Sequence, residues 1–197
     1  MSLDFNNYYF NTAKSVIENI NQKKIENIVK QLNILRKNKG RIFFIGCGGS
    51  AANASHAVND FRKLANIESY CVTDNVSELT ARINDDGWSN SFSEWLKISN
   101  LNSKDAIFVF SVGGGNKKQN VSTNIVKAVD LAIQRNSKIF GIVGRDGGYV
   151  YKKKPKNVLL LNIPKKIFIT PLTESFQALI WHCIITNPML KKNKTKW

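Results

Sequence analysis

The feature that most constrains the fold of this chain is a repeated alternation of short apolar runs with helical stretches. Helical patterns occupy residues 50–65, 120–135 and 171–186 between or after these runs. The five runs are rich in β-branched and aromatic residues: "RIFFIG" (41–46), "ESYCVT" (68–73), "DAIFVFS" (105–111), "KIFGIVG" (138–144) and "NVLLLNI" (157–163). Runs that are apolar on both faces are typical of parallel strands covered by helices on either side. The sequence therefore predicts an α/β fold with a doubly wound, five-stranded parallel sheet.

The segment before the first strand predicts a helical extension. In "YYFNTAKSVIENI" and "KKIENIVKQLNILRKN" the apolar residues recur every three or four positions, as in amphipathic helices. We expect Gly40 to end the second helix as a C-terminal glycine. The 197 residues are expected to form a single domain, with N-terminal helices (1–40), an α/β core (41–188) and a basic tail (189–197). We expect the tail to be solvated and partly disordered.

Composition narrows the possible partners and the compartment. Twenty-nine Lys and Arg against 14 Asp and Glu give a net charge of +15, which favours anionic partners, although an AT-biased genome also yields a lysine-rich chain. No helix-turn-helix, zinc-finger or aromatic ribonucleoprotein pattern is present, so we expect no nucleic-acid partner. No apolar run approaches the ~18 residues of a membrane span, and the N-terminus does not resemble a signal peptide. The widely spaced Cys47, Cys71 and Cys183 fit reduced thiols, so we expect a cytoplasmic protein without membrane partners.

Two glycine-rich turns carry the main functional signal. The first, "GCGGSA" (46–51), matches a dinucleotide-binding pattern, with Asp74 roughly placed for a ribose, but it also suits other phosphates and hydroxyls or a plain tight turn. The second, "FSVGGGNKKQNVS" (110–122), follows the third strand. Turns at the carboxyl ends of parallel strands form one crevice. A phosphorylated sugar would use both turns, one for its phosphate and one for its hydroxyl chain, whereas a nicotinamide cofactor has no particular need of the second.

Five motifs in order carry a family resemblance: "GCGGSAANASHAVNDF", "TDNVSELTARINDDGW", "FSVGGG", "GIVGRDGG" and "TPLTESFQALIWH". Together they resemble the sugar isomerase (SIS) domain over about residues 10–188, and more narrowly its phosphoheptose isomerase branch. The resemblance implies a flavodoxin-like sheet and a sugar-phosphate substrate without a nucleotide cofactor. It also implies a homo-oligomer, a tetramer, with active sites between subunits. The reaction of that branch converts sedoheptulose 7-phosphate to D-glycero-D-manno-heptose 7-phosphate, which feeds nucleotide-activated heptose for polysaccharide biosynthesis.

The resemblance also implies roles for individual residues. His56 and Asp60 are four apart and so share one helix face, which by itself also fits a solvated polar pair. By resemblance, Asp60 and His182 are the catalytic acid/base pair of an enediol mechanism. Asp60 stands where the family has glutamate, and Glu174 where it usually has glutamine. The substrate-binding residues implied are Gly48, Gly49, Ser50, Asp85, Ser111, Gly113, Gly114, Ser122 and Glu174.

An optional zinc ion is implied at His56, Asp60, Glu174 and His182, because phosphoheptose isomerases are known with zinc at the matching positions. Helix geometry constrains this set. Glu174 and His182 would lie about 12 Å apart within one helix, too far for ligands about 2 Å from one ion. Either Glu174 precedes the helix and folds back, or a neighbouring subunit supplies one ligand. We favour the second interpretation, which agrees with the predicted tetramer.

Several positions depart from the family pattern and leave rival functions open. The usual Ser/Thr-rich phosphate loop reads Ser111-Val112-Gly113-Gly114-Gly115, followed closely by Lys117 and Lys118, whose charges together with freed backbone N–H groups could hold a phosphate. Cys47 replaces an asparagine, and Leu64 an arginine. The main rival to an isomerase is a non-catalytic SIS module that senses a sugar phosphate or binds a protein. A nicotinamide-dependent oxidoreductase is the third alternative.

Overall fold

The structure, a computed structural model, describes residues 2–195, apart from the side chains of residues 2 and 3. Two helices, α1 (Ser2–Glu18) and α2 (Gln22–Lys37), precede the first strand. The elements that follow are β1 (Ile42–Ile45), α3 (Gly49–Ala65), β2 (Ser69–Cys71), α4 (Val76–Asp86), α5 (Ser91–Ile98), β3 (Ala106–Ser111), α6 (Thr123–Gln134), β4 (Lys138–Val143), α7 (Gly148–Lys153), β5 (Val158–Leu160), a 3₁₀ turn η1 (Lys166–Phe168) and α8 (Ile169–Thr186).

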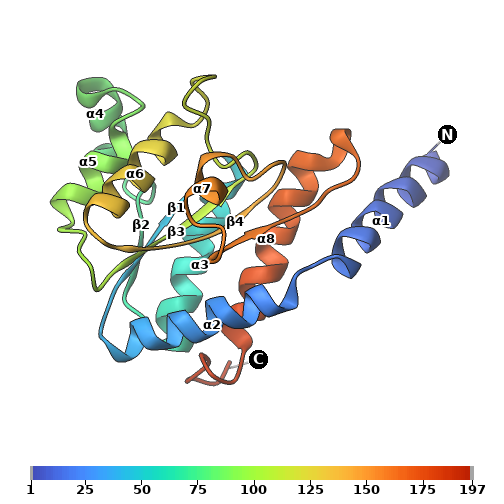
Figure 1. Ribbon diagram of the computed structural model, residues 1–197, viewed down its shortest axis with the longest axis horizontal. Coiled ribbons are helices and arrows are strands. Elements are labelled where there is room, and N and C mark those ends of the chain that lie inside the picture. Colours follow the sequence, from blue (N-terminus) through green and yellow to red (C-terminus); the bar gives the residue numbers. More distant parts are fainter. Residues whose placement is uncertain (1, 196–197) are drawn as a thin grey trace.

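The five strands form one parallel sheet in the order β2-β1-β3-β4-β5, which confirms the predicted doubly wound α/β class. Successive residues of a strand point to opposite faces of the sheet. Phe44 and Phe108 thus pack with α2, α3 and α8, whereas Phe43 and Ile107 pack with α5, α6 and α7. Figure 1 shows the helices on both sides of the sheet. All residues of β1 and β3 are buried, which explains the uninterrupted apolar runs.

The end of α2 differs from the expectation for Gly40. The left-handed residue is Lys39 (φ 54°), and the N–H of Gly40 donates to the carbonyl oxygen of Leu35. Glycine is needed at position 40 for another reason, because a Cβ there would overlap the carbonyl oxygen of Lys104. The prediction that Gly40 is the helix-ending glycine is therefore wrong; it is a site of close backbone approach.

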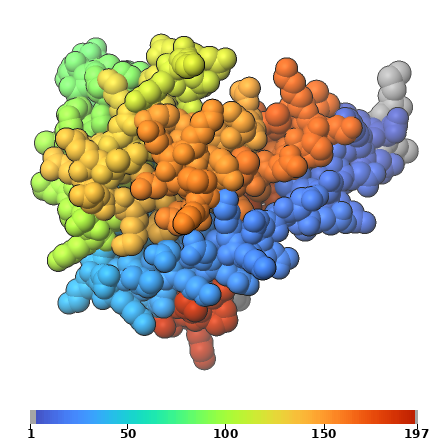
Figure 2. Space-filling model, viewed as in Figure 1, coloured from blue at the N-terminus to red at the C-terminus, as the bar shows by residue number. Residues whose placement is uncertain are grey.

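The C-terminal tail also differs from its prediction. The tail was expected to be solvated and partly disordered. Residues up to 193 are instead anchored to the body of the protein. Leu190 is fully buried, and its carbonyl oxygen accepts a hydrogen bond from Arg36 of α2 at 2.6 Å. The Asn193 side chain donates to the Lys63 carbonyl oxygen at 2.6 Å, and Figure 2 shows the tail beneath α2. Residues 196 and 197 of the predicted tail lie outside the described residues.

Helix α1 projects from the rest of the molecule (Figure 1). It is held by its buried Val16 and by the rings of Phe5, Tyr8 and Tyr9, which contact Phe168. Phe10 is nevertheless 68% exposed. Within residues 2–195 no helix is long and apolar enough to cross a membrane.

Candidate active site

The first glycine turn joins β1 to α3. Gly48 has φ 60° and ψ −130°, a conformation that only glycine adopts readily, and it immediately precedes the helix. Ser50 is 1% exposed, and its hydroxyl has no hydrogen-bond partner among the described residues. A buried polar group without a partner is uncommon in folded proteins. The turn thus offers a buried hydroxyl at the carboxyl end of the sheet, where ligands bind in open α/β folds.

The carboxylate of Glu174 already occupies the space beside this turn. A Cβ on Gly49 would overlap Oε2 of Glu174, so the glycine allows the α8 side chain to approach the first turn of α3. The Asn53 side chain donates to the backbone oxygen of Glu174 at 2.9 Å and to Oε1 of Gln177 at 3.1 Å, which fixes α8 against α3. A carboxylate is favourable at a helix N-terminus. It also repels a second anion, so this turn suits the hydroxyls of a ligand better than its phosphate.

A cluster of His56, Asp60 and His182 lies about two helical turns beyond Gly49 on α3 and beyond Glu174 on α8. Nε2 of His182 is 4.0 Å from Oδ2 of Asp60, and the two imidazole centroids are 5.5 Å apart. Ligand atoms of all three residues lie within 4.8 Å of one another. The structure therefore brings the predicted catalytic pair together, with His56 beside it. Figure 1 shows α3 and α8, which carry these residues, side by side.

Neighbouring groups orient this cluster. The Asn59 side chain donates a hydrogen bond to Oδ1 of Asp60 at 2.8 Å. The other carboxylate oxygen, Oδ2, faces His182. Nδ1 of His182 is 2.8 Å from the carbonyl oxygen of Ala178, and a proton on Nδ1 leaves Nε2 free to accept. Trp181 stacks on the ring of His182 and contacts the ring of His56 edge-on. Its position was not predicted, because a helical pattern indicates burial but not which side chains a buried ring touches.

The cluster has the donors of a three-ligand zinc site. Two imidazoles and one carboxylate are zinc ligands in proteins, and the Nδ1 contact of His182 is the arrangement that commonly orients a metal-binding imidazole. Glu174 does not belong to the cluster. It lies within α8, eight residues before His182, so the idea that Glu174 precedes the helix and folds back is wrong. A four-ligand site within one chain is thereby excluded for this conformation, whereas a fourth ligand from a second subunit remains a prediction.

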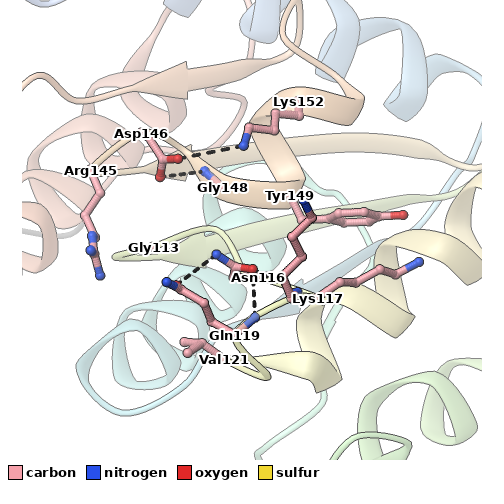
Figure 3. Close-up of a pocket in the computed structure, with 12 residues that line it drawn as sticks. Gly113, Asn116, Lys117, Gln119, Val121, Arg145, Asp146, Gly148, Tyr149 and Lys152 are labelled. Carbon is pink, nitrogen blue, oxygen red and sulfur yellow. Dashed lines mark hydrogen bonds and ion pairs between the residues drawn. The ribbon is translucent and has the colours of Figure 1, made fainter.

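The second glycine turn connects β3 to α6. The N–H of Gly114 donates to Oγ of Ser111 at 3.0 Å, and Ser122 precedes α6 with φ 48°. Asn116 and Val121 pair their backbones, so the residues between them form a small hairpin. This turn and the loop after β4 border a cavity of about 610 Å³ (Figure 3). The predicted Gly113 lines it, as do Lys117 and Lys118, whereas Ser111 lies buried beneath the turn.

The two turns meet at the centre of the sheet edge. The Asn124 side chain donates to Sγ of Cys47 at 3.4 Å, which joins the first turn to the start of α6. Burial raises the pKa of the Cys47 thiol, and this contact with Asn124 partly opposes the shift. The predicted Asp85 lies apart, exposed on α4, with Asn84 as its hydrogen-bond partner. The structure does not connect Asp85 with either turn.

Known proteins similar to this chain agree with this geometry. The SIS domain family matches residues 8–144. The lincomycin biosynthesis protein LmbN of Streptomyces lincolnensis is 29% identical over 155 residues, which cover 74% of this chain and 54% of that protein. The phosphoheptose isomerase of Neisseria meningitidis serogroup C is 30% identical over 132 residues, 64% of each chain. The chain thus spans between about half and two thirds of the length of these relatives.

Solved structures give the same result for the fold. A phosphoheptose isomerase from Francisella tularensis superposes with a TM-score of 0.79 at 25% identity, covering 93% of this chain and 96% of that one. The phosphoheptose isomerase of Neisseria gonorrhoeae has a TM-score of 0.77 at 23% identity, with 93% and 94% coverage. The chain therefore belongs to the SIS domain family, and its similarity lies with the phosphoheptose isomerase branch of that family.

Proposed function

We propose that this protein is an aldose–ketose isomerase of sugar phosphates, and that sedoheptulose 7-phosphate, the substrate of the branch it resembles, is its substrate. The observation that carries the proposal is the 4.0 Å approach of His182 Nε2 to Asp60 Oδ2, with His56 beside the pair. An isomerisation through an enediol needs one group to remove a proton from carbon and another to protonate the carbonyl oxygen. A carboxylate and an imidazole on two adjacent helices supply both.

In this proposal Asp60 and His182 move the protons, and the glycine turns bind the substrate. Asp60 would take the proton from the carbon next to the carbonyl and return it to the neighbouring carbon. His182, in its imidazolium form, would donate its Nε2 proton to the carbonyl oxygen and take back the proton of the neighbouring hydroxyl as the new carbonyl forms, and so stabilise the charge that develops there. The hydroxyl chain of the sugar would lie along the first turn, where Ser50 has an unpartnered hydroxyl and Glu174 a carboxylate that accepts hydrogen bonds.

A zinc ion fits the cluster as an optional component. His56, Asp60 and His182 would hold it, and it would supply Lewis-acid polarisation of the substrate carbonyl. The residues by themselves already offer a base and an acid, so the proposal does not depend on the metal. Within one chain Glu174 lies about two helical turns from His182 along α8, so only the Glu174 of another chain could join such a site.

The proposed assembly is a homotetramer in the cytoplasm with active sites between subunits. In a single chain His182 is 46% exposed at its side chain, which leaves the cluster open to water. Exclusion of water strengthens the electrostatic interactions on which proton transfer depends. A second chain laid over α3 and α8 would close the site, and the exposed apolar residues of α1 are available for such packing.

A panel of ketose phosphates tests the proposal. Sedoheptulose 7-phosphate, fructose 6-phosphate and ribulose 5-phosphate would each be incubated with the protein and examined by NMR for the matching aldose. We expect aldose formation from sedoheptulose 7-phosphate. Binding without conversion of any ester would instead favour a non-catalytic sugar-phosphate sensor. Stabilisation by NAD(P) but by no ester would favour the oxidoreductase.

A further inference from the structure

The orientation of the His182 ring is not fixed by the carboxylate that it faces. Nε2 of His182 lies 4.0 Å from Oδ2 of Asp60, whereas a hydrogen bond from nitrogen to oxygen spans about 2.7–3.2 Å. The His182 side chain is 46% exposed, so water supports one side of it. The contact of Nδ1 with the Ala178 carbonyl oxygen at 2.8 Å holds one atom of the ring. A further contact is needed to set the plane of the imidazole.

The indole of Trp181 supplies that contact. Its ring centroid is 3.5 Å from that of His182, with 28° between the two planes. Consecutive residues of a helix do not normally face each other, so a stack between positions 181 and 182 of α8 is unusual. Trp181 is fully buried, and its indole also meets the ring of His56 on α3 edge-on, with centroids 4.8 Å apart. The His182 ring therefore lies on a support that the core and a second helix hold in place.

Tryptophan is a costly residue for core packing at this position. Its Nε1 is buried and has no hydrogen-bond partner among the described residues. A buried indole N–H usually finds a partner, and most buried polar groups are paired. The nearby core positions of α8 hold Ile180, Ile184 and Ile185, which fill space without an unpaired donor. Departures of this kind from the rules of core packing are expected at functional sites.

We propose that Trp181 is a positioning residue, which holds the imidazole of His182 in the orientation that proton transfer requires. This assignment rests on the proposed function for the identity of the reaction. The flat indole fixes the plane of the ring and the Ala178 carbonyl fixes Nδ1, so that Nε2 is directed toward Asp60. A displacement of about 1 Å at a reacting group can cost about 10²-fold in rate, so loss of this support should lower kcat.

Steady-state kinetics with sedoheptulose 7-phosphate test the role of the indole. Trp181→Leu should lower kcat at least about tenfold and change KM less than about threefold, because substrate binding remains. Trp181→Phe should keep kcat within about threefold, because a benzene ring still stacks on an imidazole. Trp95→Leu is the matched control, since Trp95 packs edge-on against Phe43 on the opposite face of the sheet. Wild-type kcat in Trp181→Leu, or an equal loss in Trp95→Leu, would overturn the proposal.

A second background separates positioning from a general effect on the fold. If Trp181 acts through His182, Trp181→Leu should lower kcat by less than about twofold in a protein that already carries His182→Gln. A residue that only stabilises the fold would lower kcat by the same factor in both backgrounds. Equal factors would therefore overturn the proposal.

NMR of the metal-free protein tests the geometry without any turnover. The chain has two histidines, so His182→Gln assigns both sets of imidazole signals. The ring protons of His182 should show nuclear Overhauser contacts with an indole in the wild type, and Trp181→Phe should remove them. Absence of these contacts in the wild type would overturn the inference even in an active enzyme, and it needs no folded variant of Trp181. Their presence in a protein that converts no ketose phosphate would contradict the proposed function and still support Trp181 as the residue that orients His182.

Discussion

At the scale of single residues, the proposed chemistry depends on a few side chains that two helices bring together. His182 and Asp60 are 122 positions apart in the chain, yet Nε2 and Oδ2 lie 4.0 Å apart because α3 and α8 pack side by side. Asp60 is one methylene shorter than the glutamate of the resembled family. A difference of about 1 Å in the reach of the carboxylate can change a proton-transfer rate greatly. The 4.0 Å distance between Asp60 Oδ2 and His182 Nε2 is therefore the property to test.

The first prediction concerns this pair. Asp60→Asn and His182→Gln should each lower kcat by about 10²-fold or more, because each removes a group that moves a proton. Asp60→Glu should keep more activity than Asp60→Asn, since the carboxylate remains and only its reach changes by about 1 Å. Steady-state kinetics on sedoheptulose 7-phosphate check both statements, with Glu94→Gln on α5, which loses only an ion pair with Lys97, as control. Wild-type rates in Asp60→Asn would remove the carboxylate from the mechanism.

A second residue-scale prediction concerns pH. Burial raises the pKa of the Cys71 thiol from 9.0 to about 11. The unfolded chain therefore ionises this thiol first as the pH rises, so stability is intact below pH 9.0 and falls between pH 9.0 and about 11. At about 1.4 kcal/mol per pKa unit the loss is on the order of 3 kcal/mol.

Urea unfolding at pH 8 and pH 10.5 measures this loss. The difference in unfolding free energy between the two pH values should be smaller in Cys71→Ala than in the wild type. Identical differences in both proteins would show that other groups carry the alkaline destabilisation.

At the scale of helices and strands, the sequence predicts well whatever depends on local pattern. The five strands, α3 and α8 agree with their predicted ranges within two or three residues, since apolar periodicity determines them. Helix α4 was not predicted, although Val76, Leu79 and Ile83 recur at helical spacing; the helix has 11 residues, and none of them is buried. The approach of Glu174 to Gly49 depends on how distant segments pack, which no local pattern encodes.

The end of α2 provides a prediction at this scale. Gly40→Ala should destabilise the protein by about 1–3 kcal/mol, because the new Cβ would overlap the carbonyl oxygen of Lys104. Lys39→Gly should stabilise it by up to about 1 kcal/mol, because it relieves a left-handed φ of 54°. Thermal unfolding of the two variants compares them directly. If Lys39→Gly destabilised the protein while Gly40→Ala did not, glycine 40 would be the helix-ending residue after all.

At the scale of the whole molecule, the cluster on α3 and α8 and the glycine turns at the sheet edge are separated within one chain. His56 lies seven residues beyond Gly49 along α3, about 10 Å away. A site that uses the cluster, Glu174 and the second glycine turn together is most simply completed by a second subunit. The predicted homo-oligomer therefore follows from the proposed chemistry as well as from the exposed apolar residues of α1.

Mixed oligomers test this arrangement. Oligomers made only of Asp60→Asn chains, or only of Glu174→Ala chains, should have lower isomerase activity than the wild type. If one site takes Asp60 from one chain and Glu174 from another, randomly mixed pairs should regain about a quarter of wild-type activity, because half of the pairs are hybrids with one intact site of two. Co-expressed and purified hybrids would be assayed against each parent. No recovery would mean that both residues of a working site belong to the same chain.

The central claim is that the cluster moves a proton between carbon and solvent, and deuterium exchange measures this most directly. Sedoheptulose 7-phosphate would be incubated with the protein in D₂O and followed by NMR at the carbon next to the carbonyl. An enediol mechanism with an Asp60 base predicts deuterium at that carbon in the wild type and at least about 10²-fold slower incorporation in Asp60→Asn. Binding of the ester with no deuterium incorporation, or equal incorporation in both proteins, would contradict the account.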